Sequence, residues 1–283
     1  MPAARLYLPC ASLASCVYMG VERDTRGARL DQAQRLNFYP ASPLAVISWI
    51  LHGELRVLNT ASAENAPSWS DPLPSLVFSG PSRTPTISSS PGPVHAVSIA
   101  LYPEALERLF GVRAIDYLDA VLPAQQVLPV SVQDILSGVG SEPGEVFGQV
   151  EAVLGRLALG APAAGASTNV RTWLTALMTR TAFTPVGQGL RQAQRAIKRC
   201  AGQSHRDLLL YARVEQAFEM ASRLSQSKLP LAAVAAQAGY SDQSHLGREV
   251  KRVTGFSPAQ FARRLESDEA FWMYRLLQGR AAR

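Results

Sequence analysis

The sequence predicts an α+β protein with a β-rich first half and an all-α second half, and three observations support this division. Apolar residues before about position 101 occur in short runs between turn residues, whereas helical periodicity dominates after position 168. Seven prolines within residues 67–93 exclude a helix there. Residues 1–160 hold 10 arginines and 14 acidic residues, a formal charge of −4, whereas residues 161–283 hold 18 basic and 8 acidic residues, a charge of +10. The basic half predicts a polyanionic partner.

The composition excludes a disordered chain and predicts no membrane span. The 283 residues are 47% hydrophobic and 18% charged, which is enough to build a core. The longest apolar run, residues 44–51, is too short to cross a bilayer, and the N-terminus has no charged segment followed by an apolar one. Cys10, Cys16 and Cys200 are irregularly spaced, so we expect reduced thiols in a cytoplasmic protein.

The first half contains three segments with strand character. Residues 44–51 are rich in β-branched and aromatic side chains, His52 and Gly53 predict a turn, and residues 54–58 follow as a second strand. Residues 94–101 form the third predicted strand. These strands predict a β-rich domain over residues 1–160.

Helical spacing begins after Pro103, where apolar residues at positions 105, 106, 109 and 110 predict a short helix. A longer helix is predicted over residues 145–159, because valines and leucines recur there at i, i+4, i+7, i+8 and i+11. Glycine, alanine, proline and serine occupy residues 160–167. We therefore predict a linker at residues 161–167, where the charge also changes sign.

The clearest helical unit lies near the C-terminus and has the pattern of a helix-turn-helix motif. Residues 231–238 carry an apolar stripe after Pro230, and Gly239 stands where a left-handed helix end is needed. Ser241 or Asp242 can cap a second helix. Its inner face holds Leu246, Val250 and Val253, and its outer face holds Ser244, Arg248, Lys251 and Arg252, with His245 beside it. Two short helices, the second with a basic face, describe a DNA-reading unit.

A second basic helix is predicted upstream, over residues 190–201. Its outer face gathers Arg191, Gln192, Arg195, Lys198 and Arg199. Arginine and glutamine are the side chains suited to guanine and adenine edges in the major groove. Ser204 and Asp207 resemble a capping box for a third helix of some 22 residues, roughly 33 Å long. Such a helix would hold the two basic helices about one turn of B-DNA apart.

The second half resembles the DNA-binding domain of the AraC/XylS family of bacterial transcription regulators. The resemblance is carried by Val234, Ala235, Gly239, Tyr240, Ser241, Asp242, Gln243, Ser244, His245, Leu246, Arg248, Lys251, Gly255, Ser257, Pro258 and Phe261, and upstream by Arg191, Gln192, Ala193, Gln194, Arg195, Lys198 and Gly202. It extends from about residue 168 to residue 264 and implies a seven-helix domain with two helix-turn-helix units on one long connecting helix. The chain departs from the family pattern at Leu246 and Val250, where the family usually has phenylalanine, and at Pro185, which interrupts the supporting helix expected over residues 175–186.

The resemblance implies roles for individual side chains. The resemblance implies base contacts for Arg191, Gln194, Arg195, Gln243, Ser244 and Arg248. Residue type and position on the helix add two more candidates, Gln192 and His245. On a helical wheel Gln194 and Gln243 lie toward the buried side, which makes them weaker candidates than the arginines. We expect Lys198, Arg199, Lys251 and Arg252 to bind phosphates.

The first half resembles, more loosely, a cupin-like sensor domain with accessory helices. The short segments Gly80–Pro81 and 101–105 carry this resemblance. His52, Glu54 and His95 could form a metal triad, but nothing fixes their convergence, so we expect no metal and no cofactor. Nucleophile-elbow, phosphate-loop and dinucleotide motifs are missing, which argues against an enzyme. An apolar ligand pocket lined by Trp49, Phe78 or Tyr102 is a further expectation.

We therefore expect a two-domain transcription regulator, with residues 1–160 binding an effector or dimerising and residues 168–283 binding double-stranded promoter DNA. Family resemblance implies activation and contact with RNA polymerase; a small-molecule effector and a homodimer are further expected partners, and a membrane is not. The aromatic tail, residues 268–277, is predicted to pack back onto the protein. Two alternatives stay open: a small-molecule-binding protein or enzyme whose helical half no longer reads DNA specifically, and a non-specific basic DNA binder.

Overall fold

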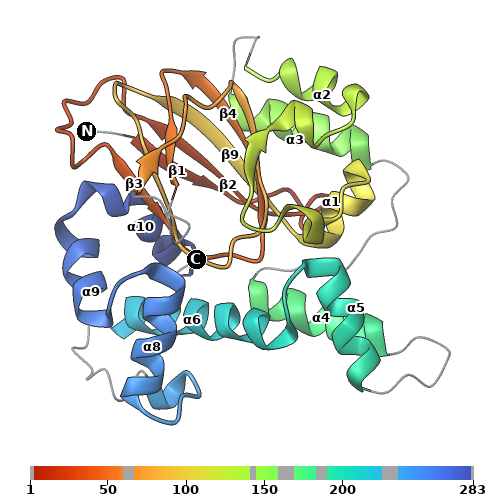
Figure 1. The fold of residues 1–283 in the computed structure, drawn as a ribbon, viewed down its shortest axis with the longest axis vertical. Coiled ribbons are helices and arrows are strands. Elements are labelled where there is room, and N and C mark those ends of the chain that lie inside the picture. Colours follow the sequence, from red (N-terminus) through yellow and green to blue (C-terminus); the bar gives the residue numbers. More distant parts are fainter. Residues whose placement is uncertain are drawn as a thin grey trace.

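The computed structural model describes residues 3–59, 67–140, 145–158, 169–182, 190–224 and 235–281, and consists of two antiparallel sheets followed by helices (Figure 1). The larger sheet has the order β1(Ala3–Tyr7), β2(Val17–Asp24), β9(His95–Leu101), β4(Ala45–His52), β7(Leu76–Ser79), β10(Val121–Pro123). The smaller has the order β3(Leu36–Tyr39), β8(Thr86–Ser89), β5(Arg56–Asn59), β6(Ser68–Trp69). Every strand pair in the two sheets is antiparallel.

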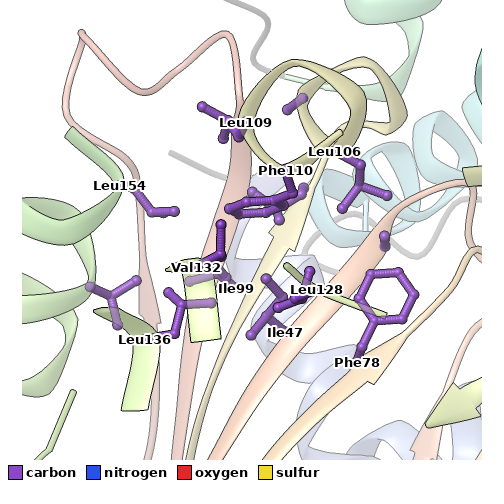
Figure 2. Close-up of a cluster of buried hydrophobic side chains, with 14 of the residues drawn as sticks. Ile47, Phe78, Ile99, Leu106, Leu109, Phe110, Leu128, Val132, Leu136 and Leu154 are labelled. Atoms are coloured by element: carbon purple, nitrogen blue, oxygen red, sulfur yellow. The ribbon is translucent and has the colours of Figure 1, made fainter. Parts of the chain in front are cut away.

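The principal core lies on one face of the larger sheet. Ala45, Ile47 and Trp49 of β4 and Val97, Ile99 and Leu101 of β9 are buried at alternate positions and so point to the same side. Three helices, α1(Pro103–Phe110), α2(Val130–Ser137) and α3(Val146–Ala158), cover this face. Figure 2 shows how their leucines and valines meet Ile47, Phe78 and Ile99 of the sheet.

The chain elements of the second half are α4(Val170–Ala182), α5(Leu190–Ala201), α6(His205–Leu224), α8(Gln243–Thr254), α9(Pro258–Ser267) and α10(Trp272–Ala281). These helices do not form an isolated core. Tyr18 and Met19 of β2 and Tyr102 share a buried cluster with Trp173 of α4 and Val214 of α6. The rings of Tyr102 and Trp173 stack with centroids 5.6 Å apart. One continuous apolar interior therefore joins the sheets to the helices.

The sequence predictions for these elements are mostly confirmed. Predicted strands 44–51, 54–58 and 94–101 correspond to β4, β5 and β9, and predicted helix 145–159 corresponds to α3. A turn is present at Gly53, whose φ is +81°, but the strand after it joins the smaller sheet and does not pair with β4. The predicted linker 161–167 and Pro185 lie outside the described residues.

The C-terminal tail packs back onto the sheets, as predicted. Trp272 is buried, and its Nε1 donates a hydrogen bond to Oδ1 of Asn37 on β3 at 2.8 Å. Phe271 and Tyr274 pack with Phe38 in a further buried cluster. Over the described part of the chain, no helix combines the length and apolar character needed to cross a bilayer.

Candidate nucleic-acid interface and the cavity beside it

The second predicted DNA-reading helix, α8, begins and ends at residues that suit those positions. Asp242 is its N-cap, and Oδ1 of Asp242 accepts a hydrogen bond from the backbone N–H of His245 at 2.6 Å. Gly239 before it and Gly255 after it have φ values of +78° and +84°, as the turn and the helix end require. Leu246 and Val250 are buried against Ala235 and Ala238. The smaller side chains at positions 246 and 250 therefore still form the core of the unit.

The outer face of α8 is open to solvent. Its exposed residues are Gln243, Ser244, Arg248, Lys251 and Arg252. The exposure of Gln243 differs from the wheel prediction, because Gln243 is the first residue of the helix and no neighbouring turn covers it. Arg252 is only partly free, since its Nη2 lies 2.6 Å from Oδ1 of Asp207 at the start of α6.

His245 is engaged within the protein and is less available to DNA than its neighbours. Its Nε2 lies 3.2 Å from Oε1 of Glu249, and its Nδ1 lies 3.3 Å from the hydroxyl of Ser241. Glu249 also accepts two hydrogen bonds from Arg213 of α6, at 3.1 and 2.5 Å. These contacts fix the orientation of α8 on α6, so His245 serves the geometry of the reading helix.

The first predicted reading helix, α5, has the same design. Ala193, Ile197 and Ala201 are buried. Its exposed residues are Arg191, Gln192, Gln194, Arg195, Lys198 and Arg199. Gln194 is exposed although the wheel placed it near the buried side, because only the stripe through Ala193 and Ile197 faces the interior. Gly202, with φ +72°, ends the helix as predicted.

Helix α6 connects the two reading helices. It contains 20 residues, which at 1.5 Å each span roughly 30 Å. Ser204 caps it, with the N–H of Asp207 donating to the Ser204 hydroxyl at 3.2 Å. In Figure 1, α5 and α8 lie near opposite ends of α6, and α5 also contacts α1 of the first half. The length of α6 approximates one turn of B-DNA.

A cavity of about 690 Å³ lies between the two sheets and is lined also by helices of the second half. Its lining comes from the larger sheet (Met19, Val21, Arg23, Val46, Ser48, Ile50, Ala96, Ser98, Ala100), the smaller sheet (Asn37, Tyr39, Val57, Thr86, Ser88) and the helices (Tyr211, Val214, Phe218, Val253, Trp272, Met273, Leu277), among others. The volume falls in the range of sites for drug-sized ligands.

The proposed pocket residues Trp49, Phe78 and Tyr102 are corrected by the structure, because none of them lines this cavity. Trp49 and Phe78 point to the opposite face of the larger sheet, into the core under α1–α3. Ser48 and Ser98 face the cavity instead, and their hydroxyls are 2.8 Å apart. The sequence signal that could have indicated this cavity is a polar serine in the middle of each of two apolar strands.

Two of the three residues considered for a metal triad, His95 and Glu54, have other partners. Nε2 of His95 lies 2.8 Å from Oε1 of Glu22, and Glu54 accepts a hydrogen bond from Arg56 at 2.6 Å. Within the described ranges no group of three or more His, Cys, Asp or Glu residues has metal-binding geometry. Of the cysteines, Cys16 is buried and Cys10 is exposed.

Comparison with known proteins identifies the helical half. A family model described as a helix-turn-helix domain matches residues 185–264. A search of curated protein sequences finds no match. Among solved structures, ToxT from Vibrio cholerae aligns over 92% of this chain and 97% of its own at 9% identity and a TM-score of 0.40. ToxT of the same organism with bound unsaturated fatty acid covers 80% and 93% at 11% identity and a TM-score of 0.35.

The AraC-like transcriptional activator CuxR covers 98% of this chain and 100% of its own at 9% identity and a TM-score of 0.19. These structural likenesses are too low to support an argument, so the assignment rests on the family model and on the paired basic helices. The matched family is DNA-binding and not enzymatic. Residues 185–264 therefore match an AraC-type helix-turn-helix domain, the DNA-binding domain of transcription regulators.

Proposed function

We propose that the chain activates transcription by binding a specific promoter sequence through α5 and α8 in successive major grooves. The bases are read by Arg191, Gln192, Gln194 and Arg195 of α5 and by Gln243, Ser244 and Arg248 of α8, with His245 holding α8 in place. Lys198, Arg199, Lys251 and Arg252 bind phosphates. Paired polar outer faces at opposite ends of one 20-residue helix carry this proposal.

The cavity supports a sensory role for the first half. It is lined by both sheets and by Val214, Phe218 and Val253 of the DNA-binding half, so an occupant would contact both halves at once. We assign residues 1–160 to effector binding, dimerisation or both, residues 161–167 to a linker, and residues 168–283 to DNA binding and contact with RNA polymerase. An effector changes the relative population of DNA-binding conformations only if it binds them with different affinity.

A binding experiment tests the DNA-reading proposal. The purified chain selects its preferred duplex from a random pool, and its affinity for that duplex and for an unrelated one is measured by gel shift over a range of salt. Arg248→Ala should weaken binding to the selected duplex by about 1–3 kcal/mol, and less to the unrelated one. Arg156→Ala, which removes an exposed arginine of α3, is the matched control for the loss of one charge.

The alternatives give different results in the same experiment. An equal loss by Arg248→Ala on both duplexes would contradict base reading by that side chain. Failure to enrich any sequence, with binding that still falls steeply with salt, would indicate a non-specific basic binder. A chain that binds no DNA at 50 mM salt would favour the alternative of a small-molecule-binding protein.

A further inference from the structure

One end of the cavity contains a buried arginine whose hydrogen-bonding capacity is not met. Arg23 of β2 lines the cavity and is only 5% exposed. Its Nη2 donates to Oε1 of Glu269 at 2.7 Å, but its Nε has no hydrogen-bond partner among the described residues. A buried donor without an acceptor is costly and points to a ligand atom.

The charges around Arg23 leave an excess of one positive charge. Glu269 accepts from Arg23 and also from Arg275, whose Nη2 lies 3.1 Å from Oε2 of Glu269. One carboxylate therefore serves two guanidinium groups. A further anion in the cavity would balance the charge beside the buried Arg23 guanidinium.

The walls beside Arg23 are aromatic and amide groups that fix its position. The guanidinium carbon lies 5.1 Å from the ring centroid of Trp272, and the rings of Trp272 and Tyr39 meet edge to face at 6.1 Å. Oδ1 of Asn37 accepts from Trp272 Nε1, so this amide is held in place as well. Asn37, Tyr39 and Trp272 all line the cavity.

The remaining charged groups of the lining already have partners. Glu215 accepts hydrogen bonds from the Tyr18 hydroxyl at 2.5 Å and from the N–H of Val170 at 2.9 Å. Tyr18 precedes Arg23 by five residues on β2, a separation of roughly 17 Å along the strand. Asp119 is paired with Arg83. The positive end of the cavity is thus at Arg23, and apolar side chains line most of the distance to Glu215.

We infer that this cavity takes a mainly apolar small molecule carrying one carboxylate, with the carboxylate at Arg23. The apolar body packs on Val21, Val46 and Ile50 of the larger sheet and on Val214 and Phe218 of α6. The inference rests on the proposed sensory function and specifies its ligand. It also gives a role to the C-terminal tail, because Glu269 and Trp272 lie beyond residue 264, where the family match ends.

The test compares acids with the matching alcohols, since these differ mainly in charge. Decanoate and 4-phenylbutyrate are titrated into the full chain by calorimetry, each beside decanol or 4-phenylbutanol. Each acid should bind about ten-fold or more tightly than its alcohol, the size expected for hydrogen bonds to a charged group. Arg23→Met should abolish that preference while leaving the affinity for the alcohols within about three-fold.

Two further variants separate the charge effect from misfolding. Arg23→Lys keeps the positive charge and should retain part of the preference for acids. Glu269→Gln removes the competing carboxylate and should strengthen acid binding several-fold. Arg5→Met, on the neighbouring strand with a side chain 68% exposed, is the matched control and should change neither affinity.

The assignment is overturned if acids and alcohols bind equally, or if the preference for acids survives in Arg23→Met. Binding of neither class up to the solubility limit would overturn both the ligand assignment and the sensory role. Alcohol binding without acid preference would leave the sensory role in place and reject only the carboxylate. The gel-shift experiment is independent of these outcomes and tests DNA reading alone.

Discussion

Single side chains fix the ends of the helices in the DNA-binding half. Ser257 caps α9 by accepting a hydrogen bond from the N–H of Gln260, and the Ser257 N–H donates one to Oε1 of Gln260 at 3.1 Å. Ser257→Ala should lower the free energy of unfolding by about 1 kcal/mol, because backbone donors of the first turn lose their acceptor. Urea denaturation measures this loss. Ser267→Ala, at the other end of α9, should change stability by less than about 0.5 kcal/mol, and an equal loss in both variants would contradict the capping role.

Asp207 makes the stability of the folded state depend on pH in a predictable direction. Burial alone would raise the pKa of Asp207, but hydrogen bonds from Ser204 and Arg252 outweigh burial and hold the pKa below its ordinary value. The stabilisation is therefore complete above the unfolded-state pKa, about 4, and is lost as the pH falls through the folded-state pKa. Asp207→Asn should lose less stability than the natural chain between pH 7 and about pH 3.

Urea midpoints over that pH range measure the difference. Asp71→Asn, which changes an exposed carboxylate of the first half, serves as the control and should keep the natural acid dependence. The same acid dependence in Asp207→Asn and in the natural chain would show that the contacts of Asp207 with Ser204 and Arg252 do not stabilise the folded state.

At the scale of elements, Gly20 allows helix α3 to approach the larger sheet. A Cβ atom at position 20 would lie 2.0 Å from Cε2 of Phe147, whose ring stacks on Tyr7. Gly20→Ala should therefore destabilise the protein by about 1–3 kcal/mol through overpacking. Phe147→Leu in the same chain should restore part of the loss, which a double-mutant cycle would measure. Gly92→Ala, where the added atom meets open space, should cost nothing, and a loss there equal to that of Gly20→Ala would contradict the packing explanation.

Elements were predictable where their sequence signal is local. The continuous apolar run of β4 and the capped, striped helices α8 and α9 carry such signals. Strand β2 does not, because Gly20, Glu22 and Arg23 interrupt its apolar pattern. The cavity depends on pairings between distant residues, such as Ser48 with Ser98 and Arg23 with Glu269. Aromatic type alone did not reveal which face of the sheet Trp49 occupies, because that depends on which face α1–α3 cover.

At the scale of the whole molecule, Trp173 couples the sheets to the helices. Its ring is 2% exposed and stacks on Tyr102, and its Nε1 has no hydrogen-bond partner within the described residues. Trp173→Ala should cost about 3–5 kcal/mol and reduce hydrogen-exchange protection in β2 and β9 as well as in α4 and α6. Trp173→Phe should cost much less, since it keeps an aromatic ring and removes an unmet donor. Reduced protection in the helices alone would contradict a shared interior.

Side chains along β4 and β9 point alternately to the packed core and to the cavity. The residues that pack the core and the residues that line the cavity can therefore change independently during evolution. Ile47 and Ile99 face the packed core, whereas Ser48 and Ser98, one residue along each strand, face the cavity. A substitution at a cavity-facing position alters the shape and polarity offered to a ligand without reaching the atoms that hold α1–α3 on the sheet. Under the proposed sensory function, the same scaffold can therefore change the ligand that its cavity accepts through a few substitutions, while its folding stability remains unchanged.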